Sequence, residues 1–144
     1  MSRDAEIKFK LSKIETLHFK KSRVLKNLSL DIIDIQINLN FEVNFQQKSI
    51  GTIFGVKYFE EGKNLIELFV KLVFEIEQET WQKLHEGNSI KIPRDFARHL
   101  AVLSVGTARG ILHCKTEKTV YNKLVLPPIN LTEVIKQDIE IFPV

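Results

Sequence analysis

The chain has 144 residues, of which 44% are hydrophobic and 27% are charged, and its formal net charge is +3. These values suit one soluble domain, residues 1–144, with its own core. No apolar run approaches the roughly 20 residues that a membrane-spanning helix needs. Charged residues interrupt the apolar ones at the N-terminus, so we expect neither membrane insertion nor export of the chain itself.

The positive charge is concentrated near the N-terminus. Residues 1–30 contain eight Lys or Arg and three Asp or Glu, a balance of +5, so the remainder of the chain carries −2. The densest stretch, Lys20–Lys26, has the clustered cations that contact nucleic acid or an acidic partner. Its shortness favours a solvated strand end and connector, and we expect no nucleic-acid binding.

The first strand is predicted from about Glu6 to Phe19. Ile7, Phe9 and Leu11 alternate with polar residues. The alternation then shifts phase at Ile14, which predicts a bulge or a bend.

Three further strands follow at short intervals. In Ile35–Phe45 every odd-numbered residue is apolar and every even-numbered residue is polar, the pattern of a half-buried strand. Polar turns at 46–49 and 61–64 lead into strands at about 50–60 and 65–77. Short connections between long strands predict an antiparallel meander, and strands followed by helices predict an α+β fold.

The fourth strand carries more apolar side chains than one covered face requires. Its even-numbered face is wholly apolar, and Leu65, Phe69 and Val73 alternate with charged residues on the other face. Helices cover only one face of a sheet in a two-layer domain. The surplus predicts contact with another subunit or with a client.

A long helix is predicted from about Arg94 to Leu112, with Pro93 suited to its first turn and Gly110 near its end. Small side chains form one stripe along it: Ala97, Ala101, Ser104 and Ala108. Such a stripe lets another helix approach closely, which predicts an oligomer interface, although it would equally suit packing on the chain's own sheet. Arg109 is interpreted as a hydrogen-bond donor to the following loop.

An extended arm, Leu124–Asn130, leads to a second and shorter C-terminal helix. Asn130, with Glu133 three residues on, forms a capping-box arrangement. The helix is predicted to continue through Ile135 to Ile139. The fold prediction is therefore a four-stranded antiparallel sheet, a meander after a long first strand, with one long and one short C-terminal helix.

No catalytic site, metal site or cofactor is predicted. The four histidines are scattered, and His113 beside Cys114 would supply two ligands that point apart on a helix. Gly51 and Gly55 lack the spacing of a phosphate loop and are expected to relieve crowding or mark a bulge. Cys114 is the single cysteine, which fits a reducing compartment, and it is interpreted as a packing residue.

Three short motifs in the last third of the chain match a known family. They are Phe96-Ala97-Arg98 near the start of the long helix, Arg109-Gly110 near its end, and the run Leu-Pro-Pro-Ile-Asn-Leu at 126–131. The chain resembles the SecB export chaperones, which have a similar Leu-x-Pro-Val/Ile-Asn-Phe pattern at the last of these positions. The order of strands, helix, arm and short helix is similar over nearly the whole chain.

The resemblance implies an ATP-independent chaperone of the bacterial cytoplasm that forms a homotetramer, a dimer of dimers, and binds unfolded polypeptide in apolar grooves. It implies that docking of the SecA motor uses Leu65 and Glu67. By position it implies a client groove lined by Ile66, Leu68, Val70, Phe96, Val125, Leu126, Ile129 and Leu131.

Two departures from the family bear on the partner. Thr16 and Lys20 stand where the family's first strand offers carboxylates to SecA, and the chain ends at Val144 without the family's acidic tail. A chaperone dedicated to one client, such as the antitoxin of a toxin–antitoxin pair, suits this pattern at least as well as an export chaperone.

The residues also leave two alternatives. A curved sheet with a helix suits a lipid or small-molecule carrier or a small enzyme, which would need a closed pocket with convergent polar groups. The basic stretch would suit a weak nucleic-acid-binding module.

Overall fold

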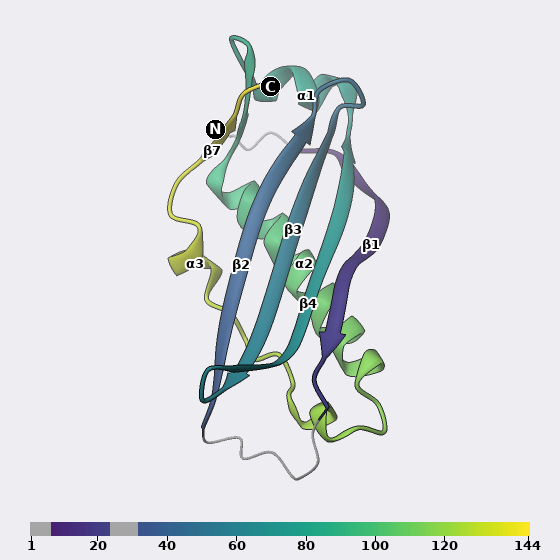
Figure 1. Cartoon of the computed structure of the whole chain (residues 1–144). Coiled ribbons are helices and arrows are strands. Elements are labelled where there is room, and N and C mark those ends of the chain that lie inside the picture. Colours follow the sequence, from purple (N-terminus) through teal and green to yellow (C-terminus); the bar gives the residue numbers. More distant parts are fainter. Residues whose placement is uncertain (1–6, 24–31) are drawn as a thin grey trace.

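The computed structural model describes residues 7–23 and 32–144. A curved four-stranded sheet forms one layer, and a long helix lies diagonally across one of its faces (Figure 1). The predicted α+β class is confirmed. Glu6, where the first strand was predicted to start, and residues 24–26 of the basic stretch lie outside the described residues.

The large sheet contains four antiparallel strands in the order β1-β4-β3-β2. These are β1 (Phe9–Lys21), β2 (Ile33–Asn44), β3 (Ser49–Glu60) and β4 (Lys63–Ile76). The last three are neighbours in chain order, which confirms the predicted meander. Because β1 pairs with β4, the strands β1 and β2 form the two edges of the sheet.

The two edge strands differ in regularity. The pairing of β1 with β4 shifts between Leu11 and Lys13 and again between Thr16 and His18. These irregularities flank Ile14, where the sequence predicts a bulge or bend. All 12 residues of β2 pair with β3 without a shift.

The two strand glycines relieve crowding, as predicted. A Cβ atom on Gly55 would lie 2.3 Å from the Phe69 ring on β4, and one on Gly51 would lie 3.0 Å from the side chain of Glu42. Glycine is therefore required at Gly55 so that the aromatic ring can cross β3.

The helix α2 (Arg94–Lys115) packs on β3 and β4 and closes the core. It runs three residues past its predicted end at Leu112. Gly110 does not end it, because the last turns still bury Leu112. The core between α2 and the sheet includes Ile50, Phe54, Val56, Leu68, Val70, Leu72, Phe74, Leu100, Val105 and Leu112.

A second, small sheet was not predicted from the sequence. It follows the helix α1 (Gln78–Leu84) and has the order β5-β6-β7, with strands β5 (His85–Glu86), β6 (Ser89–Ile92) and β7 (Ile139–Ile141). The pairing of β7 with β6 ties the end of the chain to the start of α2.

The predicted second helix exists but is shorter than expected. The helix α3 (Leu131–Val134) begins after Asn130, whose Oδ1 accepts a hydrogen bond from the N–H of Thr132 at 3.1 Å. Ile139 was predicted to continue this helix; it belongs to β7 instead, where it pairs with Ile92. Pairing with a distant strand replaces the helical turns because a four-residue helix has little stability of its own.

In the described ranges, no helix is long and apolar enough to cross a membrane.

Candidate functional site

Two arginines of α2 hold the segment that follows it, residues 124–139, which we call the C-terminal segment. Arg109 Nε donates to the carbonyl of Leu126 at 2.7 Å, and its Nη2 donates to the next carbonyl at 2.9 Å. Arg98 Nε donates to the carbonyl of Ile135 at 2.8 Å. The predicted hydrogen bonds from Arg109 to the following loop are confirmed, and the segment runs back along α2 towards β6.

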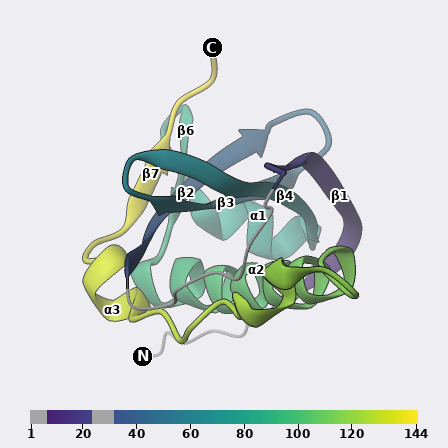
Figure 2. The same ribbon diagram turned by 60° about the horizontal axis from the view of Figure 1, so that its bottom comes forward.

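The helix α2 covers the inner strands β3 and β4, and the edge strands β1 and β2 extend beyond it on either side. An end-on view shows β1 on one side of α2 and α3 with β7 on the other (Figure 2). Each side therefore has a flank where an edge strand meets α2 or the C-terminal segment.

The flank at β2 is lined by apolar side chains that are only partly covered. Ile35, Leu39 and Phe41 share the core-facing side of the sheet, because they pair directly with Tyr58, Phe54 and Thr52 of β3. Ile35 is still 42% exposed. A hollow of about 490 Å³ lies between Leu39 and Phe41 on β2 and residues 134–139 of the C-terminal segment.

The C-terminal segment adds its own exposed apolar groups to this flank. Val125 is 60% exposed and Val134 is 45% exposed, while Ile129 and Leu131 are half-buried. We call these four residues together with Ile35, Leu39 and Phe41 the β2 flank. The outer edge of β2 also has no strand partner within the described part of the chain.

The opposite flank is also apolar, and no segment among residues 7–23 and 32–144 covers it. Leu11, Ile14 and Leu17 of β1 are 40%, 51% and 45% exposed. The helix runs beside this strand, since the Phe9 ring contacts His99 and the Lys115 ammonium lies over the Phe19 ring. We call Leu11, Ile14 and Leu17 the β1 flank.

Most of the predicted client groove lies inside the core. Ile66, Leu68 and Val70 of β4 are at most 1% exposed beneath α2, and Phe96 and Leu126 are also buried. These five side chains cannot reach a client while α2 lies on the sheet. The other three predicted groove residues are more accessible, because Val125 is exposed and Ile129 and Leu131 are half-buried.

The stripe of small residues on α2 faces the chain's own sheet. Ala97, Ala101, Ser104 and Ala108 are fully buried, and Ser104 Oγ lies 2.5 Å from Oγ1 of Thr52 on β3. Of the two interpretations of this stripe, the structure supports packing within the chain and corrects its assignment to an oligomer interface. The short side chains let α2 approach the sheet closely.

The two residues predicted to dock a motor differ in accessibility. Leu65 is buried. The Glu67 carboxylate is partly exposed, and its Oε1 lies 3.0 Å from His18 Nε2, within hydrogen-bond distance. A docking role for this pair stays a prediction.

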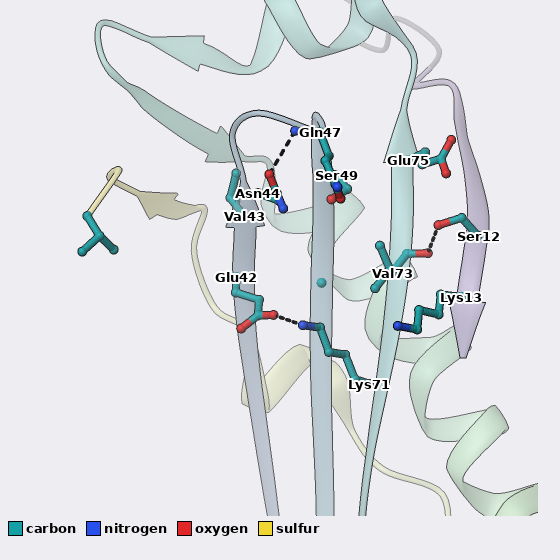
Figure 3. Close-up of a pocket in the computed structure, with 12 residues that line it drawn as sticks. Ser12, Lys13, Glu42, Val43, Asn44, Gln47, Ser49, Lys71, Val73 and Glu75 are labelled. Atoms are coloured by element: carbon teal, nitrogen blue, oxygen red, sulfur yellow. Dashed lines mark hydrogen bonds and ion pairs between the residues drawn. The ribbon is translucent and has the colours of Figure 1, made fainter. Parts of the chain in front are cut away.

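The sheet face away from α2 is polar and contains a wide hollow of about 990 Å³ (Figure 3). An ion pair between Glu42 of β2 and Lys71 of β4 crosses it above Gly51. Ser12 Oγ donates to the carbonyl of Val73 at 3.2 Å. Both signs of charge line this hollow in equal number: Lys13, Lys71, Glu42 and Glu75.

Tyr58 on β3 is the one buried side chain of the described residues with a polar atom that lacks a hydrogen-bond partner. Burial raises the pKa of its phenol to about 12, an effect that the nearby Arg109 guanidinium partly offsets. The hydroxyl therefore stays protonated through the physiological range.

The described residues offer little chemistry of other kinds. No group of three His, Cys, Asp or Glu in residues 7–23 and 32–144 could hold a metal ion. Cys114 was interpreted as a packing residue and is instead exposed near the end of α2.

The sequence did not predict that β2 lies at the edge of the sheet. Its alternation correctly predicts a half-buried strand, but the local pattern carries no information on its place at the sheet edge. No local signal could have found it, because inner and edge strands of a two-layer antiparallel sheet both have one wet face.

Comparisons with known proteins bear on the fold. No protein-family model and no curated protein matches the chain. Among solved structures, it is similar to the Mycobacterium tuberculosis Rv1957 SecB-like chaperone in complex with a ChAD peptide from the Rv1956 HigA1 antitoxin, with 9% identity and a TM-score of 0.49. The match covers 85% of this chain and 87% of that chain. Because the identity and the TM-score are this low, the functional proposal is based on the surface of the chain itself.

Proposed function

We propose that this protein is an ATP-independent chaperone that holds unfolded polypeptide against its β2 flank. The supporting observation is the amount of large apolar surface that the chain leaves in solvent on both sides of α2, including Ile35, Val125 and Val134. An unfolded client exposes groups of the same kind, and burying both surfaces together removes them from water without any chemical step.

The geometry of the β2 flank suits an extended segment. Ile35, Leu39 and Phe41 lie along one face of a straight strand, and the hollow beside Leu39 and Phe41 can receive an apolar side chain. The outer edge of β2 can in addition pair with client backbone, which would add affinity that does not depend on client sequence. Proteins awaiting export and a dedicated client such as an antitoxin would both present this chemistry.

For the β1 flank we propose a second copy of the chain as the occupant. The outer edge of β1 pairs with no strand that the structure describes and is flanked by Leu11, Ile14 and Leu17. A twofold axis would bring two such edges together in the antiparallel sense. Two dimers would then meet through the exposed face of α2, where Val102 is exposed and the absent side chains of Gly106 and Gly110 leave open space. A tetramer of this kind leaves the β2 flanks accessible.

The proposal is tested by light scattering during dilution of a chemically denatured model enzyme. We expect the wild-type protein to suppress aggregation at a ratio of one tetramer to one client, and to do so without ATP. The double variant Val125→Ser/Val134→Ser should bind a fluorescent unfolded client roughly five- to tenfold more weakly, because two half-exposed apolar groups no longer contribute.

The matched control is Phe142→Ser/Val144→Ser. It also removes two exposed apolar side chains, but from outside the β2 flank, so its client affinity should equal that of the wild type. Absence of any suppression would overturn the chaperone function. Equal loss in both double variants would overturn the assignment of the β2 flank.

A further inference from the structure

A hollow of about 340 Å³ lies where the end of β1 meets the loop after α2. Lys21 and Arg23 line it from the strand, and Lys118 lines it from the loop, together with Tyr121. No carboxylate is among the described residues that line it. We call this the basic hollow.

Hydrogen bonds fix the strand side of the basic hollow. The Ser22 N–H donates to the carbonyl of Leu65 at 2.8 Å, and Ser22 Oγ donates to the carbonyl of Asn64 at 2.6 Å. Tyr121 Oη donates to the carbonyl of Ser22 at 2.5 Å and so joins the two walls. The backbone between Lys21 and Arg23 is therefore held in place without the help of their charged ends.

The loop side is fixed as well. Thr119 Oγ1 accepts a hydrogen bond from the N–H of Tyr121 at 3.2 Å and donates to the carbonyl of Thr116 at 2.7 Å. Lys118 has a φ of 64°, a left-handed conformation in which Asn and Gly are the usual residues. A lysine at this position brings a cation to the hollow at some cost to the backbone.

The three cations are not neutralised within the described part of the chain. None of Lys21, Arg23 and Lys118 belongs to an ion pair there. Burial, and secondly the negative charge of Glu60, raises the pKa of the Tyr121 phenol. Tyr121 therefore remains a hydrogen-bond donor, and the hollow keeps a net positive charge.

The basic hollow is followed directly in the chain by the C-terminal segment. A 3₁₀ turn at Val120–Lys123 forms part of its wall, and the chain passes from this turn directly into the C-terminal segment. Val125, two residues after the turn, is 60% exposed. A polypeptide lying along the C-terminal segment would thus meet the basic hollow at one end.

We propose that the basic hollow binds an acidic stretch of the client polypeptide next to the apolar stretch that the β2 flank holds. This inference rests on the proposed function and adds a selectivity to it. Arg23 can bind a carboxylate through two parallel hydrogen bonds, and the lysines supply further positive charge. A client with Asp or Glu beside its apolar segment is therefore preferred over one without.

The surroundings favour an acidic peptide over a nucleic acid. Binding to a phosphate backbone requires an extended track of cations. Here Glu61 and Glu117 are exposed on the adjoining β3–β4 turn and loop, and Glu60 acts on the hollow itself. These three glutamates limit the positively charged surface to a small region, large enough for a few acidic side chains of a peptide.

The test uses the full chain and three fluorescent probes. The first is a peptide with four glutamates beside a Leu- and Phe-rich segment, the second is the same peptide with glutamine in place of glutamate, and the third is a short DNA duplex. At low salt we expect the glutamate peptide to bind more tightly than the glutamine peptide, and the difference to shrink as salt screens the charges.

The double variant Arg23→Gln/Lys118→Asn removes two of the cations, and asparagine tolerates the left-handed conformation at Lys118. Its affinity for the glutamate peptide should fall roughly three- to tenfold, because two partly exposed ion pairs with the peptide can no longer form. Its affinity for the glutamine peptide should not change. The control Lys83→Gln/Lys91→Gln removes the same charge from exposed positions elsewhere and should bind both peptides as the wild type does.

The outcomes separate this inference from the proposed function. If both peptides bind equally well to the wild type, or if the control loses as much affinity as Arg23→Gln/Lys118→Asn, the basic hollow does not select acidic clients, although the chaperone function stands. If the duplex binds more tightly than the glutamate peptide, the hollow is a nucleic-acid site instead. If neither peptide binds, the proposed function itself fails.

Discussion

The two edges of the large sheet carry similar apolar side chains but differ in the segments that lie beside them. The β2 edge is regular and lies beside the C-terminal segment, which Arg98 and Arg109 hold against α2. The β1 edge has two register shifts, and no segment that the structure describes covers it. Its Leu11, Ile14 and Leu17 are left 40–51% exposed.

This difference underlies the separate occupants that we propose for the two edges. The β1 strand has exposed apolar groups that no described segment covers, so one permanent partner would remove them from water. A straight strand beside a segment held by a few side-chain hydrogen bonds suits partners that come and go. The same sheet can therefore provide an assembly surface on one side and an exchange surface on the other.

The largest effect is expected from Ile14→Asp on the β1 flank. Ile14 is 51% exposed in the single chain, so the variant should fold normally, but pairing of two β1 edges would bury an unpaired carboxylate. We expect light scattering coupled to size-exclusion chromatography to report the mass of one chain, where the wild type forms an oligomer.

Asn38→Asp provides the comparison for this measurement, since it adds the same charge to the exposed face of the other edge strand. It should leave the oligomer intact. A wild-type protein with the mass of one chain, or an Ile14→Asp variant that still assembles, would show that the β1 flank is not the interface.

The next largest effect is expected from Arg98→Ala/Arg109→Ala, which releases the C-terminal segment. Each arginine donates two hydrogen bonds to backbone carbonyls, so we expect a loss of about 2–4 kcal/mol in the free energy of unfolding. Urea titration measures this loss. In a separate measurement, amide hydrogen exchange should become faster in residues 124–139 than in the wild type, while the exchange rates in β3 and β4 change less.

Arg94→Ala is the matched control, because the Arg94 side chain contacts only its exposed neighbour Asp95 within the described residues. Its effect should stay within about 0.5 kcal/mol. If the double arginine variant exchanges no faster in the C-terminal segment, other contacts hold that segment and the contrast between the flanks weakens.

The smallest effect is expected from Tyr58→Phe, beneath the β2 edge. The substitution removes a buried hydroxyl without a partner in the described residues, so the variant should be more stable by about 1 kcal/mol. The phenol has a pKa of 10.0 when unfolded and about 12 when folded. The unfolded state therefore loses its proton first, and wild-type stability should decline as the pH rises from 10 towards 12.

Comparing the two proteins across this pH range isolates the contribution of Tyr58, because the other groups titrate in both. The stability advantage of Tyr58→Phe should grow with pH. A constant difference would mean that the phenol is solvated in the native state, for instance through movement of the C-terminal segment.

The main sheet and α2 could be predicted because their signals are local. The alternation of Ile35–Phe45 spans a whole strand, and polar turns separate it from the next two strands. The small sheet could not be predicted in this way. Its strands β5, β6 and β7 have two, four and three residues, and β6 pairs with a strand nearly fifty residues away, from Ile92 to Ile139.

The candidate site was harder to predict than the fold, since a local pattern reports which side chains share a face but not what covers that face. The sequence predicts Ile66, Leu68 and Val70 as a client surface, but they lie in the core because α2 covers this face of the inner strand β4. The small residues of α2 have the spacing of a helix interface and pack on β3 through Ser104 and Thr52. Arg109 was predictable because a lone arginine at the end of an apolar helix needs nearby acceptors.

The accessible thiol near the end of α2 has a practical consequence. Cys114 is the single cysteine of the chain and is exposed, so oxidation in air could join two molecules by a disulfide at their helix ends. Such a covalent pair would have the mass of a dimer without any contact between β1 strands, and only samples kept reduced, or carrying Cys114→Ser, would report true assembly. The same sulfur offers a single attachment point for a dye, four residues from Lys118 of the basic hollow.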